Sequence, residues 1–176
     1  MSGIETRFFA GAFLRYDDEV LLMKRSEHKK IAPGLWSGIG GRIEEAEMNS
    51  PLTSCLREIE EETGIKASQI EKLDFRYFAL IKSEFGFQGT GHTLDSIYYF
   101  TGVLKEKPPL IETPEGSLYW VKPENSTNLH MSDFIKAFYP HFINNLSDDN
   151  IYCYIDSQST PPLKPGGWPT IKNPIL

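Results

Sequence analysis

GRIEEAEMNSPLTSCLREIEEETGI, residues 41–65, is the part of the sequence that constrains the fold most strongly. Its second half predicts a helix that begins after Ser50, a residue type that N-caps favour, with Pro51 at the first helical position. The helix should run to about Thr63 and end at Gly64, the residue type that helix C-termini favour. One stripe of the helix is apolar at spacings of three and four residues, and we expect it to face a core: Leu52, Cys55, Leu56 and Ile59.

The same helix carries a cluster of acidic side chains. Glu61 and Glu62 follow Glu58 by three and four residues, so the three carboxylates should emerge on one face. Like charges at this spacing repel by roughly a few tenths of a kcal/mol per pair. A divalent cation such as Mg²⁺, which prefers carboxylate oxygens, would relieve the repulsion. A solvated acidic face assisted by Arg57 accounts for the same residues, so the cluster alone does not decide between a metal site and a plain surface.

The rest of the chain predicts several strands and one further helix. Runs of β-prone residues at 7–15 and 20–24 predict a hairpin, and the glycine-rich run at 35–41 predicts a backbone-driven turn instead of a regular element. Later strands are expected over 73–81, 96–104, 118–121 and 151–155, with a helix over 132–145 that Pro140 should kink or end. This order predicts an α+β sandwich over residues 1–156, followed by an extended, proline-rich tail over 157–176.

Composition and charge restrict the class of protein. The 176 residues are 40% hydrophobic and 24% charged, which suits one globular domain and not a disordered chain. The formal net charge is −6 and no basic run is present, so we expect no nucleic-acid partner. No apolar stretch approaches the roughly 20 residues that cross a bilayer, so we expect no membrane partner. Cys55 and Cys153 belong to no metal-binding pair, which predicts free thiols and a cytoplasmic location.

Residues 41–65 resemble the Nudix box, whose pattern is G-x5-E-x7-R-E-U-x-E-E-x-G-U, where U is aliphatic. Every fixed position has its match, from Gly41 through Glu47 and Arg57 to the last aliphatic residue. One departure exists, because nine residues instead of seven separate Glu47 from Arg57. We place the extra pair at Met48-Asn49, before the helix, so that the spacing of the helical acids is kept. The departure therefore bears on the role of Glu47.

The resemblance implies a fold, a cofactor and its ligands. The fold is an α/β/α sandwich with a mixed central sheet, and the cofactor is Mg²⁺, with Mn²⁺ as the alternative. The implied metal ligands are three carboxylates and one main-chain carbonyl: Glu58, Glu61, Glu62 and Gly40.

The resemblance also implies catalytic roles. Family members often recruit one more acid from a later loop, and Glu115 is our candidate, with Glu112 as the fallback. Either Glu61, Glu62 or Glu115 would take the proton of the attacking water. Arg57 would orient a glutamate of the box and would not touch the substrate.

The stretch VLLMKRSEHKKIAPGLWSGIGGRIEE, residues 20–45, resembles the corresponding region of Nudix enzymes that hydrolyse oxidised purine nucleoside triphosphates. In that interpretation Asp133 reads a purine edge, although it can also be an acid that interacts with a helix N-terminus. Ser37 stands where relatives often carry Asn, and Lys24 with Arg25 would meet phosphates or lie in solvent at a strand end. Some aromatic residues are candidates for stacking on a base, while most should be core: Phe9, Trp36, Phe85, Phe87, Tyr98 and Trp120.

Three functions are consistent with these residues, each with a small nucleotide as partner. The first is hydrolysis of a nucleoside triphosphate, with oxidised purine nucleotides as candidates, to a monophosphate and pyrophosphate. The second is hydrolysis of ADP-ribose, a nucleotide sugar or a dinucleotide. The third is a regulator that binds a nucleotide without cleaving it, and the complete set of clustered glutamates argues against it. The sequence does not indicate the oligomeric state.

Overall fold

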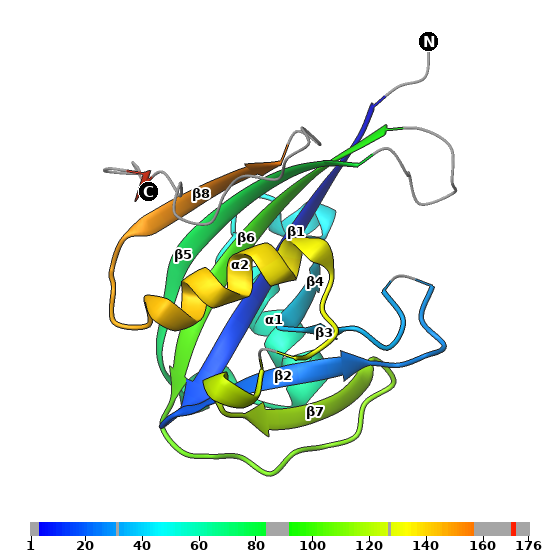
Figure 1. The fold of residues 1–176 in the computed structure, drawn as a ribbon. Coiled ribbons are helices and arrows are strands. Elements are labelled where there is room, and N and C mark those ends of the chain that lie inside the picture. The colour runs from blue at the N-terminus through cyan, green and yellow to red at the C-terminus, as the bar shows by residue number, and fades with distance from the viewer. Residues whose placement is uncertain (1–3, 31, 84–91, 127, 157–169, 172–176) are drawn as a thin grey trace.

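The computed structural model describes residues 4–30, 32–83, 92–126, 128–156 and 170–171 (Figure 1). It contains two α-helices, α1 (Pro51–Thr63) and α2 (Asp133–Asn144), within these ranges. Short 3₁₀ turns are η1 (Glu45–Glu47), η2 (Ala67–Gln69) and η3 (Pro123–Asn125). The strands in chain order are β1 (Ile4–Tyr16), β2 (Glu19–Arg25), β3 (Trp36–Ser37), β4 (Ile39–Arg42), β5 (Ile70–Ser83), β6 (His92–Leu104), β7 (Gly116–Val121), β8 (Ile151–Asp156) and β9 (Thr170–Ile171).

The strands form one mixed sheet, with the main order β3-β2-β1-β6-β5-β8-β9. β1 runs parallel to β6 and β5 runs parallel to β8, whereas the remaining pairs are antiparallel. One edge of β1 is shared, because its middle pairs with β4 and its last residues pair with β2. β7 lies along β2. The predicted α+β class with a mixed central sheet is confirmed.

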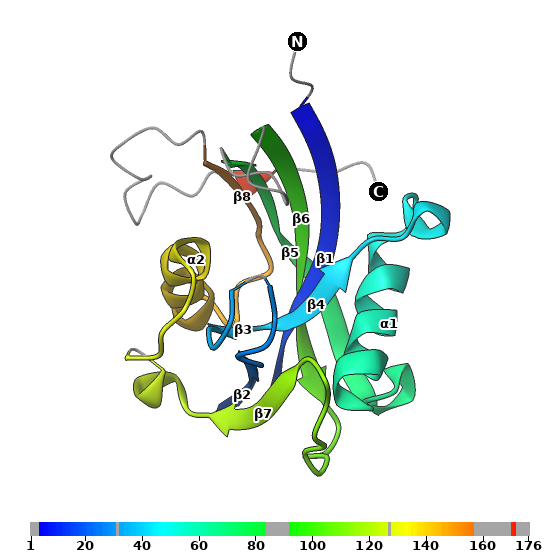
Figure 2. The same ribbon diagram turned by 90° about the vertical axis from the view of Figure 1, so that its right-hand side faces the viewer.

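The two helices cover opposite faces of the sheet (Figure 2). Cys55 and Ile59 of α1 are buried in a first apolar cluster with side chains of β1, β2, β4 and β6. Phe138 of α2 is buried in a second cluster, where its ring centroid lies 5.5 Å from that of Phe13. Because successive side chains of a strand point to opposite faces, β1 contributes Phe13 to the second cluster and the adjacent Leu14 to the first.

The predicted boundaries of α1 are confirmed. The helix begins at Pro51 and ends at Gly64, whose φ of 73° is left-handed and whose N–H donates to the carbonyl of Glu60 at 2.8 Å. The prediction that Leu52 faces a core was wrong, because this side chain is 42% exposed. The first turn of α1 extends beyond the cluster that buries Cys55, so the apolar stripe reaches past the core.

The prediction of an irregular turn over residues 35–41 was also wrong, since this segment forms β3 and β4. β4 pairs antiparallel with β1, and Gly40 lies opposite Gly11. Gly40 has a φ of 149°, and a Cβ atom there would lie 2.4 Å from the carbonyl oxygen of Ala10. The glycine that suggested a turn therefore permits a close pairing of two strands.

Other expectations concern the second half of the chain. α2 continues four residues beyond Pro140, so the proline does not end the helix. Within the last twenty residues only Thr170–Ile171 is described, and this pair forms a strand beside β8 where we expected irregular structure. The remaining tail residues, like Phe85 and Phe87, lie outside the described residues. No helix in the described ranges is both long and apolar enough to cross a membrane.

Candidate active site

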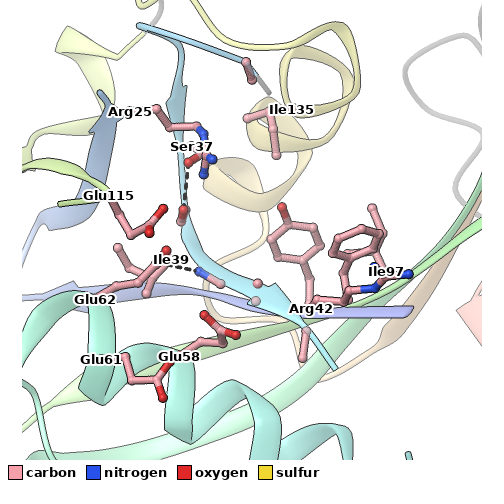
Figure 3. A pocket seen from close by; sticks show the side chains of 18 of the residues that line it. Arg25, Ser37, Ile39, Arg42, Glu58, Glu61, Glu62, Ile97, Glu115 and Ile135 are labelled. Carbon is pink, nitrogen blue, oxygen red and sulfur yellow. Dashed lines mark hydrogen bonds between the residues drawn. The ribbon is translucent and has the colours of Figure 1, made fainter. Parts of the chain in front are cut away.

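A cleft of about 610 Å³ lies between α1, β4, the segment before β7 and the start of α2. Figure 3 shows Glu58, Glu61 and Glu62 rising from α1 and Glu115 approaching from the β7 side. The cleft therefore gathers the three helical acids and the later acid that the sequence analysis singled out. It also contains Ser37 and the backbone of β4.

Glu62 is the most deeply buried of these acids, with 5% of the residue exposed. Its Oε2 accepts a hydrogen bond of 2.9 Å from the N–H of Gly40. Burial raises the pKa of this carboxyl to about 7, and the hydrogen bond from Gly40 only partly opposes the effect. Because α1 holds the side chain and β4 holds its donor, both elements fix the position of the carboxylate.

Glu58 lies one turn earlier, and 13% of its side chain is exposed. Burial is the main cause that raises its pKa, while the nearby Arg57 lowers it. Gly41 of β4 leaves room for this carboxylate, because a Cβ atom at position 41 would lie 2.5 Å from Glu58 Oε1. The two glycines of β4 therefore bring a strand against the acidic face of α1.

Arg57 is the centre of an ion-pair network beside the cleft. Its guanidinium contacts Glu47 through two hydrogen bonds of 3.0 and 3.1 Å, and it contacts Glu58 at 2.7 Å and Glu61 at 3.0 Å. It also donates to the carbonyl of Arg42 at 3.0 Å. The two extra residues, Met48 and Asn49, lie before the helix, and Glu47 still reaches Arg57 despite them.

Glu47 itself is held by more than Arg57. Its Oε2 accepts a bond of 2.6 Å from the hydroxyl of Ser54, a buried residue in the first half of α1. The hydrogen bonds from Arg57 and Ser54 lower the pKa of Glu47 to about 2. Glu47 is therefore a permanent anion that positions Arg57, and through it the acidic face of α1.

Glu61 and Glu115 are the more exposed acids, with 58% and 37% of their side chains accessible. Glu115 forms an ion pair of 2.6 Å with Lys29, which lies in the loop between β2 and β3. The carbonyl of Glu115 also accepts a bond of 2.9 Å from the N–H of Ser26 in that loop. The loop and the segment before β7 are thus joined at this acid.

The donor set suits a hard divalent cation. Two carboxylates are largely removed from water at one end of the cleft, two more lie at its edge, and like charges in such a place need a compensating charge. Among the residues that the structure describes, no three acidic, histidine or cysteine side chains already converge on one point. Full coordination would therefore draw Glu115 away from Lys29 and Glu61 away from Arg57.

Comparison with known proteins identifies the family. Residues 6–142 match the model of the NUDIX domain. The chain belongs to the Nudix family. It is a pyrophosphohydrolase of this family and acts on nucleoside diphosphate-linked compounds, in agreement with the resemblance of its box.

Solved structures of Nudix proteins share the fold. A MutT protein from Bacillus halodurans is 22% identical, with a TM-score of 0.64 over 96% of this chain and 99% of that one. The Escherichia coli dihydroneopterin triphosphate pyrophosphohydrolase is 19% identical, with a TM-score of 0.60 over 81% and 99% of the two chains. An Ap4A hydrolase from C. elegans is 17% identical, with a TM-score of 0.61 over 80% and 97%.

Several residues that we predicted for the Nudix site lie elsewhere. Lys24 is exposed on β2 and does not line the cleft, and Trp36 packs against Tyr119 with ring centroids 4.9 Å apart. Glu112, the fallback acid, is exposed and also lies outside the cleft lining. Asp133 is the first residue of α2, and its side chain is outside the described part of the structure.

The structure adds residues that the sequence analysis did not single out as substrate contacts. Tyr99 and Phe134 line the cleft, together with Phe9, which was one of several aromatic candidates. Of the two basic residues that we considered as phosphate contacts, Arg25 lines the cleft and Lys24 does not, and the positive charge of Arg25 lowers the pKa of Glu62. Strand alternation distinguishes them, because Arg25 shares a face with Leu21 and Met23, which pack under α1.

Proposed function

We propose that this Nudix protein is a Mg²⁺-dependent hydrolase of a nucleoside triphosphate, with oxidised purine nucleotides as the candidate substrates, and releases a monophosphate and pyrophosphate. The supporting observation is that the cleft has two chemically different ends. Acidic side chains with Arg25 line one end, and Ile97 and Ile135 lie toward the other, where Arg42 also lines the cleft. Figure 3 shows Ile97 and Ile135 on the side of the cleft away from the glutamates. A polyphosphate with its metal suits the first end, and a base suits the second.

The residues of α1 and β4 would hold and orient the metal. Glu58 and Glu62 are the principal ligands, since Arg57 and the Gly40 N–H already fix their carboxylates. Glu61, Glu115 and the carbonyl of Gly40 complete the donor set. When bound, Mg²⁺ lowers the pKa of a coordinated water and neutralises charge on bridging phosphate oxygens.

Proton transfer would fall to a less constrained acid. Glu115 stands across the cleft from α1 and pairs with Lys29 instead of the Arg57 network, so its carboxylate would accept the proton of the attacking water once it leaves Lys29. Glu61, at the exposed edge, is the alternative. Arg25 is placed to contact phosphate oxygens beside Glu62.

The test is hydrolysis of a panel of nucleotides with Mg²⁺ and chromatographic separation of the products. The panel contains ordinary and oxidised purine triphosphates, ADP-ribose, nucleotide sugars and a dinucleotide. Release of pyrophosphate and a monophosphate, lost in Glu61→Gln or Glu115→Gln, would support the proposal. Preferential cleavage of ADP-ribose, a nucleotide sugar or a dinucleotide would replace it with the second function. Binding of a nucleotide without turnover would overturn it.

A further inference from the structure

A second large hollow lies on the α1 side of the sheet and shares no lining residue with the active-site cleft. It is a groove of about 900 Å³ between the first turn of α1, strands β5 and β6, and the start of β8. We call it the α1 groove and define it by its principal apolar lining residues, Met48, Leu52, Leu73, Phe75, Tyr98, Phe100 and Ile151, and by four charged lining residues, Lys72, Asp74, Arg76 and Asp149.

The α1 groove has an apolar wall and floor beside its charged residues and is partly open to solvent. Met48 and Leu52 form the wall and are 44% and 42% exposed, so they add to one apolar patch with the strand residues below them. Phe75 and Tyr98 lie partly buried on the strands, with ring centroids 5.8 Å apart. Met48 belongs to the two-residue insertion in the Nudix box, so the insertion builds this wall. A contiguous apolar surface of this kind indicates an interaction site.

The register of β9 sets the direction in which the chain runs beside the groove. Thr170 and Ile171 pair antiparallel with Tyr152 and Ile151, so the chain runs along β8 toward its first residue. Ile151 lines the groove, and so does Asp149, two residues further in the same direction. The direction of β9 therefore points toward the end of the groove that Asp149 and Ile151 line.

The length and chemistry of residues 172–176 match the groove. Three strand spacings separate β9 from β6, which is about 14 Å at about 4.8 Å per spacing. Five extended residues span up to about 17 Å. The segment reads Lys-Asn-Pro-Ile-Leu, so a cation comes first and apolar residues follow. Asp149, whose side chain is 84% exposed and lies 3.4 Å from the Nζ of Lys72, stands at the end of the groove where the cation would enter.

We propose that residues 172–176 of this chain dock into the α1 groove, with Ile175 and Leu176 covering its apolar wall and floor. The docked segment would cover Met48, one residue after Glu47, and would thereby stabilise the turn that presents Glu47 to Arg57. This interaction is independent of the substrate that the active site takes. Its failure would leave the proposed hydrolase function untouched, because its readout is stability without metal or nucleotide.

The experiment compares full-length variants by thermal unfolding in EDTA. Ile175→Asp with Leu176→Asp should lower the Tm by about 4–8 °C, the shift expected for half-burying two aliphatic side chains. The matched control is Leu110→Asp, an aliphatic side chain that is 41% exposed and lies outside the groove lining, which should leave the Tm unchanged. The Met48→Ser and Leu52→Ser pair should lose most of its sensitivity to the tail substitutions, because the two surfaces would share one contact.

Two results would overturn the proposal. The first is an unchanged Tm when Ile175 and Leu176 are both replaced by aspartate. The second is a fall in Tm accompanied by dissociation of a dimer in sedimentation equilibrium, which would show that a second copy covers the groove. As a direct contact test, Met48→Cys and Ile175→Cys in a Cys153→Ser background should form an intramolecular disulfide under mild oxidation. A disulfide between two chains would instead support the dimer.

Discussion

Replacing Glu62 with glutamine should stabilise the metal-free protein while removing its activity. The carboxyl of Glu62 is buried, and its pKa is raised from an ordinary value near 4.5 to about 7. A raised pKa means that the folded state binds the proton more tightly than the unfolded state. The stability that the folded state gains from holding this proton is therefore complete below about pH 4.5 and is lost as the pH rises through 7.

The magnitude follows from the size of this change. Each pKa unit corresponds to about 1.4 kcal/mol, so ionising Glu62 at pH 8 costs the folded state about 3 kcal/mol, and at pH 5 about 1 kcal/mol. Glutamine keeps an oxygen that can accept the N–H of Gly40 and carries no charge. Glu62→Gln should thus raise the free energy of unfolding by about 3 kcal/mol at pH 8, or the Tm by about 6–12 °C.

Urea unfolding in EDTA at pH 5 and pH 8 measures this difference. Glu61→Gln is the matched control, because the side chain of Glu61 is 58% exposed and its loss should change stability by less than about 0.5 kcal/mol. Saturating Mg²⁺ should narrow the gap at pH 8, since the metal binds the wild type and compensates the buried charge. A variant that is less stable than wild type at pH 8, or equally stabilised at both pH values, would refute the reasoning.

Three further predictions concern the surroundings of the site. Glu47→Gln should lower the affinity for Mg²⁺ or the turnover by about 10–100-fold, because Glu47 positions Arg57. The circular dichroism spectrum should not change. Unchanged metal binding and turnover would contradict this role. Lys29→Met should raise the affinity for Mn²⁺, measured by calorimetry, by about 2–5-fold because Glu115 loses a competing cation. The control is Lys30→Met at the exposed neighbouring residue, which should leave the affinity unchanged. An equal effect of both variants would count against the ion pair. A thiol reagent at pH 8 should label Cys153 and leave Cys55 unmodified until the protein unfolds. The reason is that Cys55 is buried, which raises its pKa to about 12. Rapid labelling of both thiols would show that α1 opens.

The sequence predicted features that depend on neighbouring residues. The ends of α1 were correct because Ser50, Pro51 and Gly64 act locally on the backbone. The acidic face was visible for the same reason, since helical spacing alone brings Glu58 and Glu62 together. The apolar spacing also placed Cys55 and Ile59 in the core, as the structure confirms.

Features that depend on distant segments were missed. Residues 36–42 became strands because β1 and β2 offered edges to pair with, and local glycine content gave no sign of this. Leu52 is exposed because no described element covers the first turn of α1. The pair of Lys29 and Glu115 joins residues 86 positions apart, and no periodicity connects them.

Mg²⁺-dependent turnover in Glu58→Gln tests most directly the claim that the buried acids of α1 form a catalytic metal site. The matched control is Glu60→Gln, which removes an exposed carboxylate of the same helix that does not line the cleft. We predict a rate for Glu60→Gln like that of the wild type. For Glu58→Gln we predict a fall of at least about 100-fold, together with weaker Mn²⁺ binding. Wild-type turnover and Mn²⁺ affinity in Glu58→Gln would contradict the account.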